Sequence, residues 1–130
     1  MTIIEFKHIS YQVKEKQILH DVSFKVDRGD FLTLVGPSGS GKSTILKLTA
    51  NLISPTAGDI FYQDKKMAKY DPVQYRREVS YCFQQPSLFG KTVRENLIFP
   101  YEIRRQVVVE KRIDELLKLV CLLYTSDAAD

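Results

Sequence analysis

The stretch FLTLVGPSGSGKST, residues 31–44, decides how the rest of this 130-residue sequence is interpreted. It opens with a nearly continuous apolar run, which is typical of a β-strand covered on both faces in a parallel sheet. The residues from Gly36 to Ser43 then fit the pattern G-x-x-x-x-G-K-[ST]. Apolar residues follow with a helical period at Ile45, Leu48 and Leu52. Strand, glycine-rich loop and helix in this order predict a phosphate-binding loop.

Each residue type in the loop suits this chemistry. The glycines let the backbone wrap tightly, so that successive N–H groups point at phosphate oxygens. A helix that begins at Lys42 adds the positive end of its dipole. Lys42 is expected to reach the β- and γ-phosphates of a nucleotide, and Ser43 to place its hydroxyl on Mg²⁺. The predicted nucleotide-binding residues of the loop are Gly36, Ser38, Gly39, Ser40, Gly41, Lys42, Ser43 and Thr44. The alternative is a chance Gly/Ser/Lys loop, which the strand before it and the helix after it disfavour.

Local patterns predict the elements around the loop. Alternation of apolar and polar residues indicates strands over residues 2–13 and 21–26, and shorter apolar runs indicate strands over 60–62 and 79–83. Helix starts are expected where capping residues stand, with Asp71 followed by Pro72, and with Thr92 followed three residues later by Glu95. A further amphipathic helix is expected between Val107 and Val120.

Composition limits the function classes. The net charge is only +3 and the basic residues are scattered, so no nucleic-acid partner is expected. The N-terminus lacks the apolar segment of a signal peptide, and no apolar run reaches the length of a membrane span. A membrane role would therefore act through a partner. The two cysteines lie far apart without metal-ligand spacing, which favours a reducing, cytosolic setting.

Two longer stretches carry a resemblance. ISYQVKEKQILHDVSFKVDRGDFLTLVGPSGSGKSTILKLTANLISPTAGDI and, further on, VSYCFQQPSLFGKTVRENLIF resemble the ATP-binding subunit of ABC transporters over residues 2–120. The resemblance implies an α/β fold of the P-loop NTPase class. It would comprise an antiparallel β part (1–30), a parallel-sheet core from the phosphate loop to the Q-loop (31–86) and the start of a helical subdomain (87–120).

The resemblance also implies two site residues outside the loop. Tyr11 matches the family's aromatic residue that stacks on adenine; the alternative is a tyrosine on a strand face. Gln84, followed by Gln85 and Pro86, matches the Q-loop glutamine that touches Mg²⁺ and the attacking water, and it is counted with Lys42 as a catalytic residue. The alternative is a pair of loop glutamines.

The function implied is an ATP-binding subunit that couples ATP binding and hydrolysis to transport. Its partners would be a transmembrane permease subunit and a second copy of the ATP-binding subunit. It would lie peripherally on the cytoplasmic side of the cell membrane. The stretch VSYCFQQPSLFGKTVRENLIFPYEIRR is similar to subunits of iron exporters within this family. Alternatives that stay open are a non-transport ABC protein acting in repair or translation, and a stand-alone nucleotide-binding or interaction module.

Several of the family's motifs do not occur in residues 87–130. There is no SGG of a signature loop, no apolar strand that ends in Asp-Glu, and no histidine after His20. We therefore expect an N-terminal fragment of an ATPase that does not hydrolyse ATP by itself. The segment CLLYTSDAAD, residues 121–130, back-translates to a string that resembles a transposase sequencing adapter. We interpret it as an artefact, the alternative being a natural polar tail.

Overall fold

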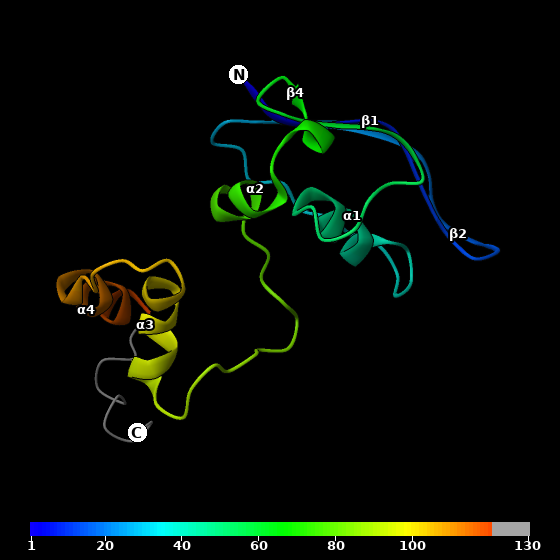
Figure 1. Ribbon diagram of the computed structural model, residues 1–130. Coiled ribbons are helices and arrows are strands. Elements are labelled where there is room, and N and C mark those ends of the chain that lie inside the picture. The colour runs from blue at the N-terminus through cyan, green and yellow to red at the C-terminus, as the bar shows by residue number, and fades with distance from the viewer. Residues whose placement is uncertain (121–130) are drawn as a thin grey trace. The chain divides into compact units, whose positions relative to one another are not determined.

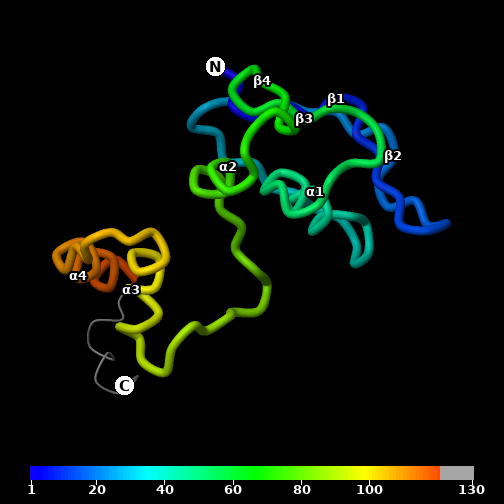
Figure 2. Tube along the Cα trace, viewed as in Figure 1, coloured from blue at the N-terminus to red at the C-terminus, as the bar shows by residue number. Residues whose placement is uncertain are grey.

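The computed structural model describes residues 1–120 of the chain. The segment 121–130, interpreted above as adapter sequence, lies outside the described residues. The chain divides into two compact units, Met1–Cys82 and Phe83–Asp130. Figures 1 and 2 follow the chain through both units, which are described one at a time.

The first unit is built on a four-stranded antiparallel sheet of order β2-β1-β3-β4. Its long hairpin consists of β1 (Thr2–Val13) and β2 (Lys16–Asp27), and the other edge of β1 pairs with β3 (Ala57–Tyr62). The short strand β4 (Lys65–Lys66) completes the sheet. The strands predicted at 2–13, 21–26 and 60–62 are confirmed, the second and third with earlier starts.

The hairpin contains a paired irregularity that sets which side chains face the core. His8 and Asp21 both adopt left-handed backbone angles, with φ of 52° and 50°, and the register of β1 against β2 shifts beside them. Their side chains meet, with 2.7 Å between His8 Nδ1 and Asp21 Oδ1. Because side chains alternate along a strand, the extra residue brings Phe6 and Ile9 to the same face.

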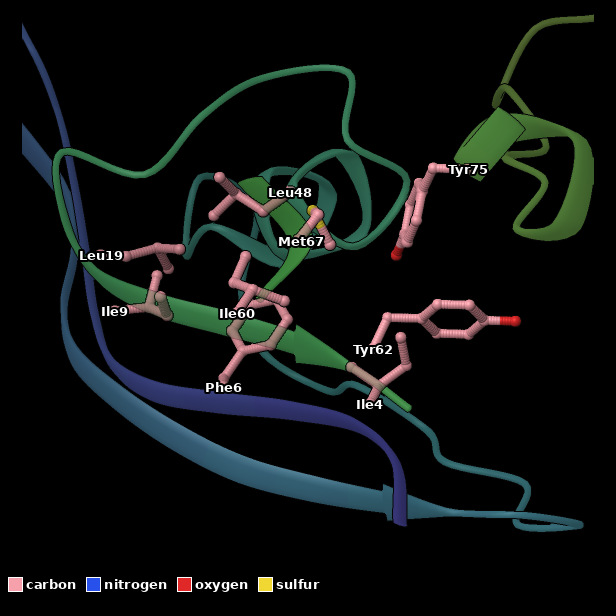
Figure 3. Close-up of a cluster of buried hydrophobic side chains, with 9 residues drawn as sticks. All are labelled: Ile4, Phe6, Ile9, Leu19, Leu48, Ile60, Tyr62, Met67 and Tyr75. Carbon is pink, nitrogen blue, oxygen red and sulfur yellow. The ribbon is translucent and has the colours of Figure 1, made fainter. Parts of the chain in front are cut away.

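Helices α1 (Lys42–Thr49) and α2 (Pro72–Glu78) pack their apolar side chains with those of the sheet, together with the 3₁₀ turn η1 (Met67–Lys69). Helix α2 begins as predicted, because the Asp71 carboxylate accepts a hydrogen bond from the Gln74 N–H at 3.1 Å and Pro72 is the first helical residue. Figure 3 shows the resulting core, which consists of Ile4, Phe6, Ile9, Leu19, Leu48, Ile60, Tyr62, Met67 and Tyr75.

The strands predicted at 31–35 and 79–83 are not formed, and this part of the prediction was wrong. Both segments lack strand structure, and Phe31 and Val35 are 95% and 86% exposed. A strand of a parallel sheet is stabilised by strands on either side and by layers above and below it. Within residues 1–120 no segment pairs with residues 31–35, so their apolar pattern does not produce a strand.

The second unit contains α3 (Val93–Ile103) and α4 (Glu110–Leu119). The capping box predicted at the start of α3 is present: Thr92 Oγ1 accepts from the Glu95 N–H at 3.1 Å, and the Glu95 carboxylate accepts from the Thr92 N–H at 3.3 Å. The helix predicted between Val107 and Val120 is confirmed with narrower bounds. Among residues 1–120, no helix has the length and apolar character needed to cross a membrane.

Candidate nucleotide-binding site

The segment from Gly36 to Gly41 forms a tight loop that leads directly into α1. The Ser40 N–H donates to the Pro37 carbonyl at 3.2 Å, which closes a turn. Gly39 and Gly41 have φ of +80° and +95°, angles that glycine adopts without steric cost. The Ile45 N–H donates to the Gly41 carbonyl at 3.0 Å, the first hydrogen bond of α1.

Strand β2 fixes the end of the loop at Gly41. A Cβ atom at this position would lie 2.7 Å from Leu19 Cδ2 and 3.3 Å from the Ile18 carbonyl oxygen. Leu19 is itself only 4% exposed, so its side chain has little room to move away. The glycine therefore lets the start of α1 lie directly against the sheet, and the sheet determines where the loop ends.

The Lys42 ammonium group is held by the loop. Lys42 Nζ donates to the carbonyl oxygens of Gly36 at 2.6 Å and Pro37 at 2.8 Å, and to Ser40 Oγ at 3.2 Å. These acceptors bring the positive charge back over the loop that precedes it in sequence. An anion bound by the loop would therefore meet this charge directly.

The first turn of α1 suits the same anion. Gly41 is its N-cap and supplies no side-chain cap, and the first turn contains no acidic residue. The N–H groups of a helix's first turn have no partner within the helix and mark the positive end of its dipole. Ser43 is exposed at this turn, and its hydroxyl is a hard oxygen ligand of the kind that Mg²⁺ prefers. Backbone N–H groups, an ammonium group and a hydroxyl together fit a Mg²⁺-bound polyphosphate.

Tyr11 lies opposite Leu19 in the hairpin, and Leu19 is the residue beside the end of the loop. Tyr11 is half-buried in β1, and its register partner in β2 is Leu19, the residue that contacts Gly41. Gln84 belongs to the second unit. The predicted roles of both residues stay predictions.

The contact between Gly41 and β2 was missed in the sequence. The alternation of β2 marks Leu19 as a core residue, but it gives no sign of which segment the side chain meets. The motif predicts that Gly41 is needed for its backbone angle. The structure adds that the space beside it is occupied by Leu19 and Ile18.

The glycine-rich loop, the lysine it holds and the uncapped helix start define a protein of the phosphate-loop nucleotide-binding class. Comparison with known families gives the same answer more specifically. The model of the family described as "ABC transporter" matches residues 19–129. The chain belongs to the ABC transporter family, and the predicted fold class is thereby confirmed.

Individual relatives agree. The chain is 42% identical over 104 residues to the "Probable iron export ATP-binding protein FetA" of Escherichia coli (strain K12), a match that covers 80% of this chain and 46% of that protein. It is 36% identical over 124 residues to the "Carnitine transport ATP-binding protein OpuCA" of Listeria monocytogenes serotype 1/2a (strain 10403S), covering 92% of this chain and 31% of the relative. The chain thus spans less than half the length of each.

A solved structure shows the same fold. A bacterial Atm1-family ABC exporter with ATP bound superposes with a TM-score of 0.84 at 26% sequence identity. The superposition covers 93% of this chain and 21% of the exporter chain. The chain therefore shares its fold with one part of a larger ABC protein.

Proposed function

We propose that this chain is the N-terminal part of an ATP-binding subunit that couples ATP binding and hydrolysis to transport by a membrane partner. The observation that carries the proposal is the Lys42 ammonium group, held over a glycine-rich loop at the uncapped start of α1. Membership of the ABC transporter family supports ATP as the nucleotide.

Different residues are proposed to bind different parts of the Mg²⁺-nucleotide. Backbone N–H groups of the loop would bind phosphate oxygens, with Lys42 placed for the β- and γ-phosphates and Thr44 in the first helical turn. Ser43 would bind Mg²⁺, which when bound offsets part of the phosphate charge. Tyr11 would stack on the adenine, and Gln84 would contact Mg²⁺ and the water that attacks the γ-phosphate. The loop residues proposed to bind are Gly36, Ser38, Gly39, Ser40, Gly41, Lys42, Ser43 and Thr44.

The second unit is proposed to face the permease. A groove there is lined by Leu88, Lys91, Thr92, Val93, Asn96 and Leu97. Asn96 holds the loop before α3: its Oδ1 accepts from the Phe89 N–H at 2.7 Å, and its Nδ2 donates to the Thr92 carbonyl at 2.6 Å. A loop held in this way offers a formed surface to a helix of the permease.

Such a subunit would work as a homodimer, peripherally on the cytoplasmic side of the cell membrane. The likeness to a protein named for iron export favours a metal, and iron in particular, as its substrate.

Hydrolysis is proposed to need residues that this chain does not supply. Phosphoryl transfer depends on positioned charges and a positioned water, so Lys42 and Ser43 alone bind nucleotide without catalysing its hydrolysis. The 130-residue chain is therefore expected to bind ATP and to show no turnover.

The test of nucleotide binding is a titration of the chain with Mg²⁺-ATP. Lys42→Ala is expected to raise the Kd at least about tenfold, because it removes a charge-assisted interaction with phosphate. Lys47→Ala is the matched control, because it removes the same charge from the last turn of the same helix. Equal affinities for the two variants would contradict the proposal.

The transport role has a separate test. The complete coding sequence and a neighbouring gene for a multi-span membrane protein would be expressed together and reconstituted in vesicles. ATP-dependent iron movement that stops in the Lys42→Ala variant is expected. ATP hydrolysis without movement of iron would refute iron as the substrate, and absence of hydrolysis by the complete protein would refute the ATPase assignment.

A further inference from the structure

The C-terminal end of α1 is held by two side chains of α2. The Tyr75 hydroxyl donates to the Thr49 carbonyl at 2.5 Å, and Arg76 Nη1 donates to the Asn51 carbonyl at 3.1 Å. The last carbonyls of a helix have no partner within it, so the Tyr75 bond to Thr49 satisfies an acceptor that would otherwise need water. The Arg76 bond holds the turn that directly follows the helix. Helix α1 is therefore anchored at both ends, at its start by β2 and at its end by α2.

Tyr75 is well placed to act as a fixed anchor. It is 1% exposed, and its ring packs against Tyr62 with centroids 5.3 Å apart and against Tyr70 with centroids 5.8 Å apart. Burial raises the pKa of the Tyr75 hydroxyl above its ordinary value, so the group keeps its proton and remains a donor. The Tyr62 hydroxyl in turn donates to Glu78 at 2.9 Å, which ties the end of α2 to β3.

The length of α1 makes the second anchor relevant to the loop. Eight residues span only about 12 Å, so a helix of this size moves as a short rod. A tilt at its end therefore changes the direction of the N–H groups in its first turn. The side chains of Leu48 and Ile45 pack the helix against the core, and the hydrogen bond from Tyr75 adds a directional attachment at its C-terminal end.

We propose that Tyr75 is a positioning residue for nucleotide binding, acting through α1 together with Arg76. The Tyr75 hydroxyl holds the end of the helix so that its first-turn N–H groups and Lys42 face the phosphates. This inference rests on the proposed function, because it assumes that the loop binds a nucleotide.

The chain offers a matched pair of variants for the test. Tyr75→Phe and Tyr70→Phe each remove one hydroxyl that donates to a backbone carbonyl in the same ring cluster. The Tyr70 hydroxyl bonds the Tyr62 carbonyl of β3 at 2.8 Å, whereas the Tyr75 hydroxyl bonds α1. In the full 130-residue chain, Tyr75→Phe is expected to raise the Kd for Mg²⁺-ATP about three- to tenfold, from the loss of one hydrogen bond. Tyr70→Phe is expected to leave the Kd unchanged. Both variants are expected to lower the Tm by similar amounts, because each loses one hydrogen bond.

A second readout does not depend on nucleotide. Amide hydrogen exchange at Ile45, whose N–H makes the first hydrogen bond of α1 to the Gly41 carbonyl, is expected to accelerate in Tyr75→Phe more than exchange in the β1–β2 hairpin, and not to do so in Tyr70→Phe. If the wild-type chain fails to bind ATP, the proposed function is refuted while exchange still tests the positioning role.

Arg76→Gln addresses the same end of α1 at an exposed position, should Tyr75→Phe fail to fold. Its control is Arg77→Gln, which removes an equal charge from the neighbouring residue. Weaker binding or faster exchange of the Ile45 amide in Arg76→Gln alone supports the proposal. Equal effects within both pairs of variants would overturn it, because the role of α2 would then be general stability.

Discussion

Gly41→Ala tests whether the position of the phosphate loop depends on contact with the sheet. Two costs are expected. Alanine at a φ of +95° is strained by about 1–2 kcal/mol, part of which is offset because alanine also restricts the unfolded chain by about 0.4–1 kcal/mol. The added Cβ would also lie 2.7 Å from Leu19 Cδ2, about 1 Å closer than an ordinary carbon contact.

The second cost is the larger one. Overpacking a filled interior costs about 1–3 kcal/mol, and the buried Leu19 side chain and the Ile18 carbonyl leave little space for relaxation. The free energy of unfolding is therefore expected to fall by about 2–4 kcal/mol. Gly39→Ala is the control, because Gly39 has a similar φ of +80° but no atom within 4 Å of the added Cβ. Its expected cost is about 1 kcal/mol.

The measurement is urea unfolding followed by circular dichroism, at a protein concentration where the chain is monomeric. The two variants are expected to differ by about 1–3 kcal/mol, the overpacking contribution alone. Added nucleotide serves as a control: because only the folded chain binds it, it should raise the free energy of unfolding. Equal losses of stability in Gly41→Ala and Gly39→Ala would refute the argument that β2 determines where the loop ends.

Three further outcomes are expected. The wild-type chain is expected to self-associate through the apolar segment around Phe31, which is 95% exposed, and Phe31→Lys is expected to lower its light scattering because it places a charge in that segment; unchanged scattering would contradict this. Asn96→Ala lowers the free energy of unfolding by about 1–3 kcal/mol and accelerates exchange of the Phe89 amide, whose acceptor it removes; an unchanged Phe89 rate would contradict this. The paired hydrogen bonds from Arg94 lower the pKa of the Glu110 carboxyl in the folded chain. These bonds therefore stabilise the fold above the pKa that Glu110 has in the unfolded chain, and this stabilisation is lost as the pH falls through the pKa that Glu110 has in the folded chain. Titration of Glu110 by NMR is expected to show this pKa return to its ordinary range in Arg94→Gln.

Local features of the fold were predictable from the sequence. The cap at Asp71 and the capping box of Thr92 and Glu95 involve residues three apart, so neighbours in the sequence decide them. The phosphate loop is equally local, since its glycines, its lysine and the start of α1 lie within eight residues. The family motif therefore located the candidate site before any tertiary contact was known.

The predicted strand at 31–35 shows where local reasoning stopped. An apolar run favours a strand only if another segment pairs with it, and pairing depends on parts of the chain that are distant in sequence. Among the described residues that partner is missing, and Phe31 stays exposed. The irregularity at His8 and Asp21 could not be predicted from local sequence either. Neither position holds the glycine that usually marks a left-handed backbone.

The sequence by itself determined the family, the phosphate loop and the starts of α1, α2 and α3, because these depend on residue types at short, fixed spacing. Only the tertiary structure decided what holds the loop in place. Gly41 meets Leu19 from a strand more than twenty residues earlier, and Tyr75 bonds to Thr49 from a helix more than twenty residues later. Such contacts depend on how the chain folds back on itself, and no short motif records them.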